Sequence, residues 1–325
     1  MNVMLSIVVP TYNHEHYITK ALESILAQVV DFEYEVLIGE DISTDNTRQV
    51  LKELEKKLPS RFQVLYREKN LGMHGNFRDL KERASGKYIT TLEGDDYWTY
   101  EHKLQKQVDF LESHPEYIAV AHNTTVIDRE GNEMPDIGYP ECKESEYTLM
   151  HFRRHLFPGH TATVMYRNFH KQRLISTNLE TVEGFAVDIP LNFLLVANGR
   201  VRCIQEAWSA YRLVQSGTTN FTSLFKDDDK FKTAKVRFYK SIYVYSLNEL
   251  KTEESIKITA QLYFFNYFRQ SVGRAPVCKF SAFLRDFMAG KYRISALLYI
   301  LQRIASRPFK DKMNVELGAG FIRKK

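Results

Sequence analysis

Acidic side chains gather at two places in the first hundred residues, and each group directly follows a run that is typical of a buried strand. Glu40-Asp41 follows the run Tyr34–Ile38, and Glu93-Gly94-Asp95-Asp96 follows Lys87–Leu92. If both runs belong to one parallel sheet, the two groups meet at its carboxyl edge, where ligands of such sheets bind. Neighbouring carboxylates repel one another unless a cation or hydrogen-bond donors compensate. A hard divalent metal that bridges to a diphosphate is the simplest compensation, and helix capping or a solvated rim is the alternative.

The elements that must position these acids alternate along the first 130 residues. Strand-like runs at 5–9, 34–38, 62–66 and 87–92 are separated by segments whose apolar residues recur every three or four positions, as on one face of a helix. One of these helices is expected over 78–84. The alternation predicts an α/β fold with a mostly parallel sheet flanked by helices.

The pattern changes in the second half of the chain. The polar stretch Pro135–Glu146 is expected to form a loop over the site, and helical spacing of apolar residues dominates from about residue 226. Between them we expect strands over 117–128, 161–166 and 201–204, and a helix over 189–198.

Composition excludes several classes of protein. The 325 residues are 44% hydrophobic and 26% charged, an ordinary globular balance. Three scattered cysteines without C-x-x-C spacing argue against a disulfide framework or a zinc site and fit a reducing cytosol. The first residues lack a basic segment typical of a signal peptide, and no apolar run approaches the roughly 20 residues that span a bilayer. We therefore expect a cytoplasmic protein, with peripheral contact at the inner face of the cell membrane left open.

The segment after the first strand narrows the chemistry. Pro10-Thr11-Tyr12-Asn13 contains no G-x-G-x-x-G, which counts against a dinucleotide-dependent dehydrogenase, and the chain has no Walker A loop. The segment also lacks the glycine-rich basic loop that a nucleotidyltransferase usually carries there.

Three motifs carry a resemblance to a known family. Residues 6–13 (SIVVPTYN), 40–47 (EDISTDNT) and 88–98 (YITTLEGDDYW) resemble the family 2 glycosyltransferases of the GT-A fold, over about residues 4 to 215. The resemblance implies a GT-A type, Rossmann-like sheet in a catalytic domain at 1–225, with a nucleotide-binding half at 1–115 and an acceptor half at 116–225. The remaining residues, 226–325, would form a helical C-terminal region.

The same resemblance implies roles for individual residues. Glu93-x-Asp95 would be the D-x-D motif, with Asp95 as the direct ligand of Mn²⁺ or Mg²⁺, and Thr11 and Asp41 would contact the base and ribose. Asp96 would contact the acceptor or support its loop. Nucleotide-sugar binding is predicted for Pro10, Thr11, Tyr12, Asn13, Glu40, Asp41, Asn70, Gly72, Glu93, Asp95 and Arg212.

Near Tyr211, position 214 departs from the family pattern, and the role of Arg212 has two interpretations. The family often has Y-R-x-H here, but Val214 stands in place of the histidine, and Gln215 and Ser216 are weaker substitutes. Arg212 could pair with phosphate or be structural.

The expected chemistry needs a base. A nucleoside diphosphate develops negative charge as it leaves, which a divalent metal stabilises, and the attacking hydroxyl must lose a proton. Asp188, just before the helix at 189–198, is the predicted catalytic base, with a plain N-cap as the alternative role and Glu183 as the alternative base. Direct attack would invert the sugar's configuration. His160 is either an acceptor contact or a packing residue.

The C-terminal region holds a local basic excess, with nine Lys or Arg and two Asp between Arg274 and Lys312. One interpretation is packing on the catalytic domain or on a second copy. Another is peripheral membrane contact, because apolar residues there alternate with basic ones. No nucleic-acid-binding module is recognised. The residues are Phe280, Phe283, Leu284 and Phe287 among Lys279, Arg285, Lys291 and Arg293.

The sequence therefore predicts an inverting, metal-dependent glycosyltransferase. The expected donor is a UDP-sugar, and the expected acceptor is a glycan or lipid-linked molecule of surface polysaccharide or glycoconjugate synthesis. A non-catalytic nucleotide-sugar binding or scaffold protein and a nucleotidyltransferase are the alternatives.

Overall fold

The first strand, β1 (Leu5–Thr11), lies inside the molecule with both of its faces covered. Leu5, Ile7 and Val9 pack with the first helices on one side of the sheet, and Val8 packs on the opposite side. This is the environment that a continuous apolar run predicts, since parallel strands are covered on both faces. The computed structural model describes residues 3–169, 179, 188–213, 229–272, 277–305 and 322–323.

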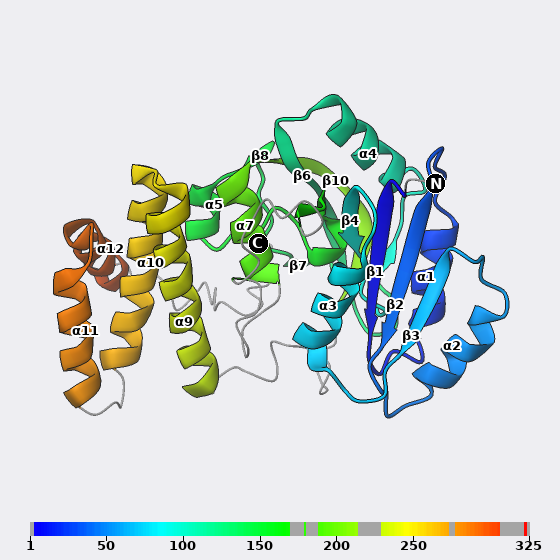
Figure 1. Cartoon of the computed structure of the whole chain (residues 1–325), viewed down its shortest axis with the longest axis horizontal. Helices are drawn as coiled ribbons and strands as arrows, with labels where there is room; N and C mark the ends of the chain where they lie inside the picture. Colours follow the sequence, from blue (N-terminus) through cyan, green and yellow to red (C-terminus); the bar gives the residue numbers. More distant parts are fainter. Residues whose placement is uncertain are drawn as a thin grey trace.

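A nine-stranded mixed sheet forms the centre of the molecule (Figure 1). Its strand order is β3-β2-β1-β4-β9-β6-β10-β5, and β8 pairs with β10. β1 is parallel to both β2 and β4, β2 to β3, and β10 to β6, so the prediction of a mostly parallel sheet is confirmed. Its other strands are β2 (Tyr34–Glu40), β3 (Phe62–Tyr66), β4 (Tyr88–Thr91), β5 (Tyr97–Trp98), β6 (Tyr117–Ile127), β8 (Glu146–Tyr147), β9 (Met165–Arg167) and β10 (Arg200–Arg212).

Helices pack on the central sheet, and a second, smaller sheet lies outside it. A separate two-stranded sheet joins β7 (Ile137–Gly138) to β11 (Ile322–Arg323). The helices around the sheet are α1 (Ile18–Leu26), α2 (Thr47–Glu55), α3 (Gly72–Arg83), α4 (Lys103–Ser113), α5 (Leu149–Arg153), the 3₁₀ turn η1 (Thr161–Thr163) and α7 (Asp188–Asn198).

Three predicted elements differ from the structure. The strand expected over 161–166 is instead η1 followed by the short β9, which is antiparallel to both β4 and β6. The strand expected over 201–204 extends from 200 to 212, because β6 pairs along its whole length. The helix expected over 78–84 begins at Gly72; two glycines and the polar His74 and Asn76 in its first turns hide the helical spacing.

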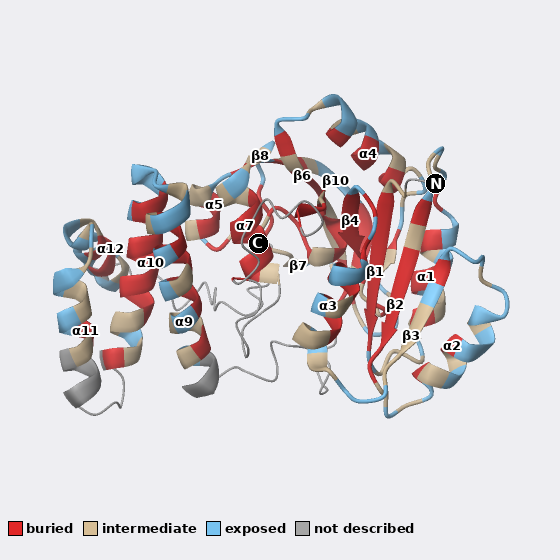
Figure 2. Cartoon of the chain, viewed as in Figure 1, coloured by how far each residue is buried: buried red, intermediate tan, exposed pale blue. Residues whose placement is uncertain are grey.

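Beyond the sheet, four helices and a π-helical turn form one end of the molecule: α9 (Asp229–Tyr245), η3 (Ser246–Leu250), α10 (Glu253–Val272), α11 (Val277–Ala289) and α12 (Arg293–Ala305) (Figure 1). Their inner faces are buried (Figure 2). Phe283 is 3% exposed, and its ring lies 5.5 Å from that of Phe287. These two phenylalanines therefore pack in the helical core, and they do not form the exposed basic surface that the sequence suggested. Across the described residues, we find no helix whose length and apolarity would let it cross a membrane.

Candidate functional site

The carboxyl ends of three parallel strands meet at one place. The backbone N–H of Asp41, after β2, donates to the carbonyl of Thr11 at 3.1 Å. The N–H of Gly94, after β4, donates to the carbonyl of Pro10 at 3.3 Å. The end of β1 thus lies between the two acidic segments, and the expected convergence at one edge of the sheet is confirmed.

Gly94 allows an unusually close approach at this edge. A Cβ atom there would lie 2.6 Å from Nδ1 of His14 and 2.9 Å from Oγ1 of Thr11, which no side chain can tolerate without displacement. His14 in turn places Nε2 at 3.7 Å from Oδ1 of Asp95. His14 is not among the predicted site residues, although it directly follows the motif at residues 6–13 and lies close to the end of β1.

Asp41, which follows β2, is hydrogen-bonded to the segment that contains Asn70 and Gly72. The carboxylate of Asp41 accepts from the N–H of Leu71 at 2.7 Å, and Nδ2 of Asn70 donates to the Asp41 carbonyl at 2.7 Å. Asn70 also accepts from the N–H of Gly72. Burial raises the pKa of Asp41, and the donors at Leu71 and Gly72 oppose that shift. Asp41, Asn70 and Gly72 therefore lie together, as predicted.

Two other residues that were predicted to contact the sugar donor, Glu40 and Asn13, are bonded to neighbouring residues of the protein. Glu40 is fully buried, accepts from the N–H of Ser43 at 2.7 Å and forms an ion pair with Arg48. Asn13 has a positive φ of 58° and accepts from the N–H of Thr44 at 2.8 Å. These bonds hold the loops after β1 and β2 together. They favour a supporting role, and nucleotide contact by these two residues stays a prediction.

Pro10 and Tyr12 flank Thr11 and differ in exposure. Pro10 is buried, whereas Tyr12 is 39% exposed at the rim. Thr11 is 1% exposed, and its hydroxyl has no hydrogen-bond partner among the described residues. A buried hydroxyl without a partner is costly, so this atom is available to a ligand.

Glu93, Asp96 and His160 form a cluster that could hold a metal ion. One ligand atom from each lies within 4.8 Å of the others. Asp96 is 2% exposed; its Oδ1 accepts from the N–H of Arg212 at 2.8 Å, and its Oδ2 lies 3.4 Å from Nδ1 of His160. Within the described parts of the chain, Oε2 of Glu93 and Oδ2 of Asp96 are buried without a hydrogen-bond partner. Two carboxylates and an imidazole fit a divalent cation.

Electrostatics at this cluster follow from burial. Burial, with the charge of Asp95 second, raises the pKa of Glu93 to about 8 and holds that of Asp96 well above its usual range. Burial also lowers the pKa of His160 to about 3. All three groups therefore resist charge when no cation is bound. A divalent cation would reverse this preference at the two carboxylates.

Asp95, the ligand predicted from the sequence, is outside this cluster. Its carboxylate lies beside His14 and is about one-fifth exposed. Direct coordination by Asp95 stays a prediction, and the described geometry brings Glu93, Asp96 and His160 together instead. His160 is 8% exposed, with its ring 4.1 Å from that of Tyr211 and 5.3 Å from that of Tyr139. It is therefore enclosed, which suits a ligand better than an acceptor contact.

The predicted base lies near the cluster. Asp188 is the first residue of α7, and its Oδ1 accepts from the N–H of Ile189 at 2.9 Å. Burial raises the pKa of Asp188 to about 6, and its charge contributes to the raised pKa values of Glu93 and Tyr139. Tyr139 belongs to the stretch 135–146, so this loop does reach the site. Glu183, Val214, Gln215 and Ser216 lie outside the described residues.

Arg212 is held by backbone carbonyls. It is 4% exposed, with Nε donating to Asp95 at 3.0 Å and Nη1 donating to Asp128 and Arg129 at 3.0 and 2.8 Å. Its guanidinium also covers the ring of Tyr17 at 4.3 Å. This geometry favours the structural alternative, and contact with phosphate stays a prediction.

Comparison with known proteins identifies the family of the chain. The model of "Glycosyl transferase family 2" matches residues 6–174. An uncharacterized protein of Mycobacterium tuberculosis is 32% identical over 235 residues, which are 70% of this chain and 63% of that relative. The chain thus spans less than two thirds of this relative. The poly(ribitol-phosphate) beta-N-acetylglucosaminyltransferase TarS of Staphylococcus aureus is 36% identical over 113 residues, which are 34% of this chain and 19% of TarS.

Solved structures share the fold. The crystal structure of S. aureus TarS 1–349 in complex with UDP-GlcNAc has a TM-score of 0.63 at 19% identity, covering 94% of this chain and 92% of that one. The protein thus has an α/β fold, with an acidic cluster at the carboxyl ends of its parallel strands. The chain belongs to glycosyl transferase family 2.

Proposed function

We propose that this protein transfers a sugar from a UDP-sugar to a hydroxyl group of a glycan or lipid-linked acceptor, with inversion at the anomeric carbon. The observation that carries the proposal is the convergence of Thr11, Asp41 and the 93–96 segment on one edge of the sheet, with buried polar atoms of Thr11, Glu93 and Asp96 that lack partners among the described residues. Support for UDP comes from TarS, whose crystal structure holds UDP-GlcNAc. Surface polysaccharide synthesis is the proposed setting, since TarS acts on poly(ribitol-phosphate).

Donor binding is assigned to the first half of the site. The free hydroxyl of Thr11 and the buried carboxylate of Asp41 would bond the base and ribose, and Asn70 and Gly72 hold Asp41 in place. Tyr12 would cover the nucleotide from the rim. Glu40 and Asn13 keep the two loops in register, as their bonds to Ser43 and Thr44 indicate.

The metal is assigned to Glu93, Asp96 and His160, with Asp95 facing the diphosphate side. The fit rests on two buried carboxylate oxygens without partners and on an enclosed imidazole. Mn²⁺ or Mg²⁺ bound there would stabilise the negative charge that the leaving diphosphate develops. His160 supplies the nitrogen that the family pattern places downstream, where this chain has Val214.

Asp188 is assigned as the base. With a pKa of about 6, it is ionised near neutral pH and is still basic enough to take a proton from an attacking hydroxyl. Its Oδ1 accepts from the N–H of Ile189 at the start of α7, which would hold the carboxylate in place. The proposed division of the chain follows: 1–115 binds the donor, 116–225 supplies the base and acceptor side, and 226–325 is the helical region.

Donor hydrolysis tests the proposal. We would screen nucleotide sugars with the purified protein, with Mn²⁺ and with EDTA, and compare Asp188→Asn and Asp95→Ala. We expect one UDP-sugar to be hydrolysed, Mn²⁺ to be required, and Asp188→Asn to lose turnover by about 100-fold or more while it still binds UDP. Binding of UDP-sugar without any turnover would favour the scaffold alternative, and release of diphosphate from a nucleoside triphosphate would favour a nucleotidyltransferase. Intact turnover in both variants would refute the site assignment.

A further inference from the structure

Helix α12 is apolar on two opposite faces. Ala296, Tyr299 and Ile300 face the helical core and are 0–9% exposed. The opposite side is solvent-facing, and its large side chains recur at steps of three and four. A helix packed on one face ordinarily has polar residues on the other, so packing within the chain does not explain this apolar stripe. The stripe consists of Ile294, Leu297, Leu298, Leu301 and Ile304, which are 71%, 44%, 62%, 53% and 42% exposed.

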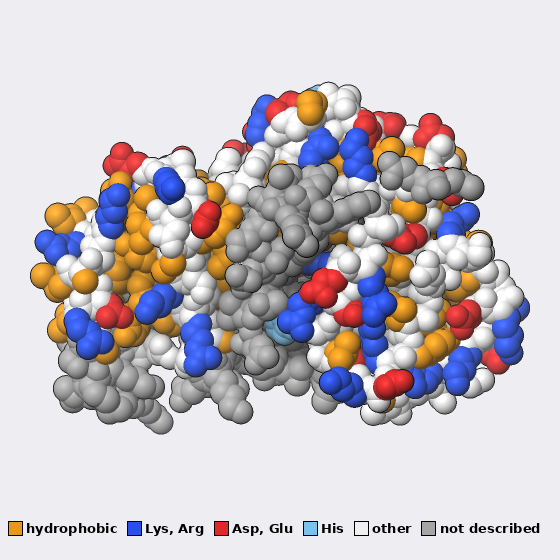
Figure 3. All heavy atoms as spheres, viewed as in Figure 1, with side chains coloured by type: hydrophobic (Ala, Val, Ile, Leu, Met, Phe, Trp, Pro, Cys, Tyr) orange, Lys and Arg blue, Asp and Glu red, His pale blue; other side chains and the backbone are white. Residues whose placement is uncertain are grey.

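The neighbouring helix extends the same surface. Leu284 and Met288 of α11 lie one turn apart and are 44% and 59% exposed. In the space-filling view, hydrophobic side chains gather with Lys and Arg at the end of the molecule formed by α10, α11 and α12 (Figure 3). The exposed residues here are aliphatic, whereas the aromatic Phe283 is in the core.

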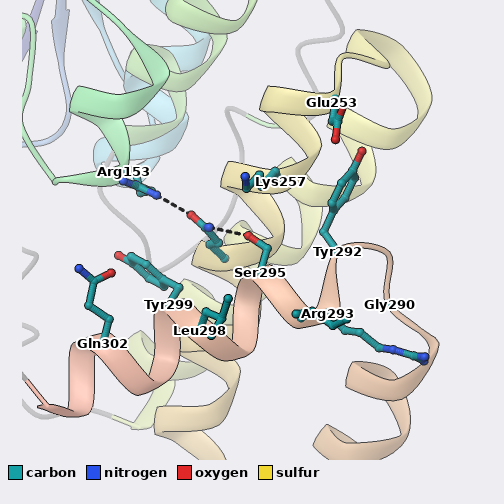
Figure 4. A pocket seen from close by; sticks show the side chains of 12 residues that line it. Arg153, Glu253, Lys257, Gly290, Tyr292, Arg293, Ser295, Leu298, Tyr299 and Gln302 are labelled. Carbon is teal, nitrogen blue, oxygen red and sulfur yellow. Dashed lines mark hydrogen bonds between the residues drawn. The ribbon is translucent and has the colours of Figure 1, made fainter.

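A groove of about 710 Å³ borders the stripe, between α5, α10 and α12 (Figure 4). Ile294 and Leu298 of the stripe line it, together with the cationic side chains of Arg153, Lys257 and Arg293. Groove and stripe are therefore one continuous surface, part apolar and part cationic.

The cations of the groove are not neutralised within the described structure. Arg153 donates Nη1 to Oε1 of Gln261 at 2.7 Å, and Arg293 donates to the carbonyl of Met288 at 2.6 Å. Among the described residues, neither arginine nor the exposed Lys257 has a carboxylate within 4.0 Å. The one acid that lines the groove, Glu253, interacts with the hydroxyl of Tyr292. The groove is thus suited to an anion.

The sign of the charge selects the occupant. Residues 277–305 contain five Lys or Arg and one Asp. A second copy docked about a two-fold axis would bring two such basic surfaces together, and they would repel each other. An anionic bilayer has the opposite charge and offers an apolar layer beneath its phosphates. α12 is about 20 Å long, so it would lie in the plane of the interface.

We propose that the α12 stripe and its groove bind the surface of an anionic phospholipid bilayer. The leucines and isoleucines enter the headgroup–acyl boundary, and Arg153, Lys257 and Arg293 contact lipid phosphates. This would hold the catalytic site near lipid-linked acceptors. The binding itself needs no catalysis, so it is tested separately from the proposed transfer reaction.

Vesicle flotation tests the proposal. Vesicles of phosphatidylcholine alone are compared with vesicles that contain about one third phosphatidylglycerol. We expect binding only to the anionic vesicles, weakened by salt, and about a tenfold or larger loss for Leu298→Asp and for the double reversal Lys257→Glu/Arg293→Glu. Val29→Asp is the matched control, because Val29 is a 51% exposed apolar residue on the far half of the chain. Leu298→Ser tests loss of the apolar contact without an added charge.

Three results would overturn the proposal. One is unchanged vesicle binding by both Leu298 variants and the charge reversal. Another is no difference between anionic and neutral vesicles. The third is a dimer in sedimentation velocity that Leu298→Asp dissociates, with no vesicle binding by the wild type; the stripe would then be an interface between copies. Melting temperatures confirm that each variant is folded.

Discussion

His160 and Asp96 face each other as two hydrogen-bond acceptors, with Nδ1 3.4 Å from Oδ2. The same Nδ1 accepts from the N–H of Ala162, so it carries no proton to donate to the carboxylate. Both side chains are nearly inaccessible to water. The pair therefore needs either a proton on Asp96 or a cation between the two atoms. Proton and metal ion compete for one place.

Replacement of His160 should weaken the metal site. We expect His160→Ala to lower Mn²⁺ affinity by at least about tenfold, since it removes the nitrogen ligand. Isothermal titration with Mn²⁺, without any nucleotide, measures this. His16→Ala is the control, because the His16 side chain is two-thirds exposed and away from the cluster. An unchanged titration in His160→Ala would show that the imidazole is only a packing residue.

Thr11→Val should separate binding from stability. The Thr11 hydroxyl is buried without a partner in the described structure, so its loss should not lower the free energy of unfolding and should raise it by about 1 kcal/mol. UDP affinity should fall about tenfold, the value of one buried hydrogen bond. Thr90→Val is the matched control: it loses a 2.9 Å bond to the Val164 carbonyl, so about 1 kcal/mol of stability should go with no change in UDP affinity. The opposite pattern would contradict the assignment.

Asp188 should set the acid limb of activity. Burial raises its pKa to about 6, and a base must be ionised, so turnover should fall as the pH drops through 6. A folded pKa above the unfolded value favours folding at low pH and costs stability above pH 6. Asp188→Asn should therefore abolish turnover and still raise the melting temperature at pH 8. A pH–rate profile that is flat between pH 5 and 7 would remove Asp188 as the base.

Replacement of Arg212 distinguishes a structural role of its side chain from a role in phosphate binding. Arg212→Gln loses bonds to the carbonyls of Asp95, Asp128 and Arg129, so we expect about 3 kcal/mol of destabilisation in urea unfolding. Arg83→Gln is the control, because Arg83 is exposed and, among the described residues, pairs with Asp79 on its own helix. We expect this substitution to destabilise the protein by less than about 1 kcal/mol. Normal stability with a raised KM for the donor would instead support a phosphate contact.

Lys103 is a buried cation without a carboxylate partner in the described structure. Its Nζ donates to Oε1 of Gln107 at 2.8 Å and lies 4.1 Å from the ring centroid of Trp98. Burial holds the pKa of Lys103 well below its usual range, so between its folded and unfolded pKa values the unfolded chain binds more protons than the folded chain, and stability rises with pH there. Lys103→Met should stabilise the protein by about 1–2 kcal/mol at pH 7, with a smaller gain near pH 10. Exposed Lys106→Met should show neither effect.

Local patterns were enough to predict the strands within residues 1–115. The strand over 62–66 has the predicted bounds, and β1 and β2 continue only two residues further, to Thr11 and Glu40. β1 and β2 could be predicted because both of their faces are covered, which gives each a nearly continuous apolar run. β9 was misjudged because its pairing with β4 and β6 depends on residues far away in the chain.

The sequence predicted where on the sheet the site lies, but not which residues contact one another there. The order of strands and acidic groups in the sequence was enough to predict that Asp41 and Thr11 lie at one edge of the sheet, whereas Asn70 was predicted only through the family resemblance. His160 and Asp96 are in contact although they are 64 positions apart in the sequence (160 − 96). Spacing rules for helices and strands do not predict contacts over that separation. The burial of Phe283 was likewise invisible, because the same apolar residue suits a core or an exposed helix face.

The tight fit at Gly94 has a consequence for how this sequence can evolve. The middle position of the acidic motif is formally free, yet here it is closed to every other amino acid while Thr11 and His14 keep their places. A lineage that exchanged Gly94 would have to retract one of those two side chains first. Substitutions at positions 11, 14 and 94 are therefore coupled, because a side chain at position 94 needs a smaller or displaced side chain at position 11 or 14.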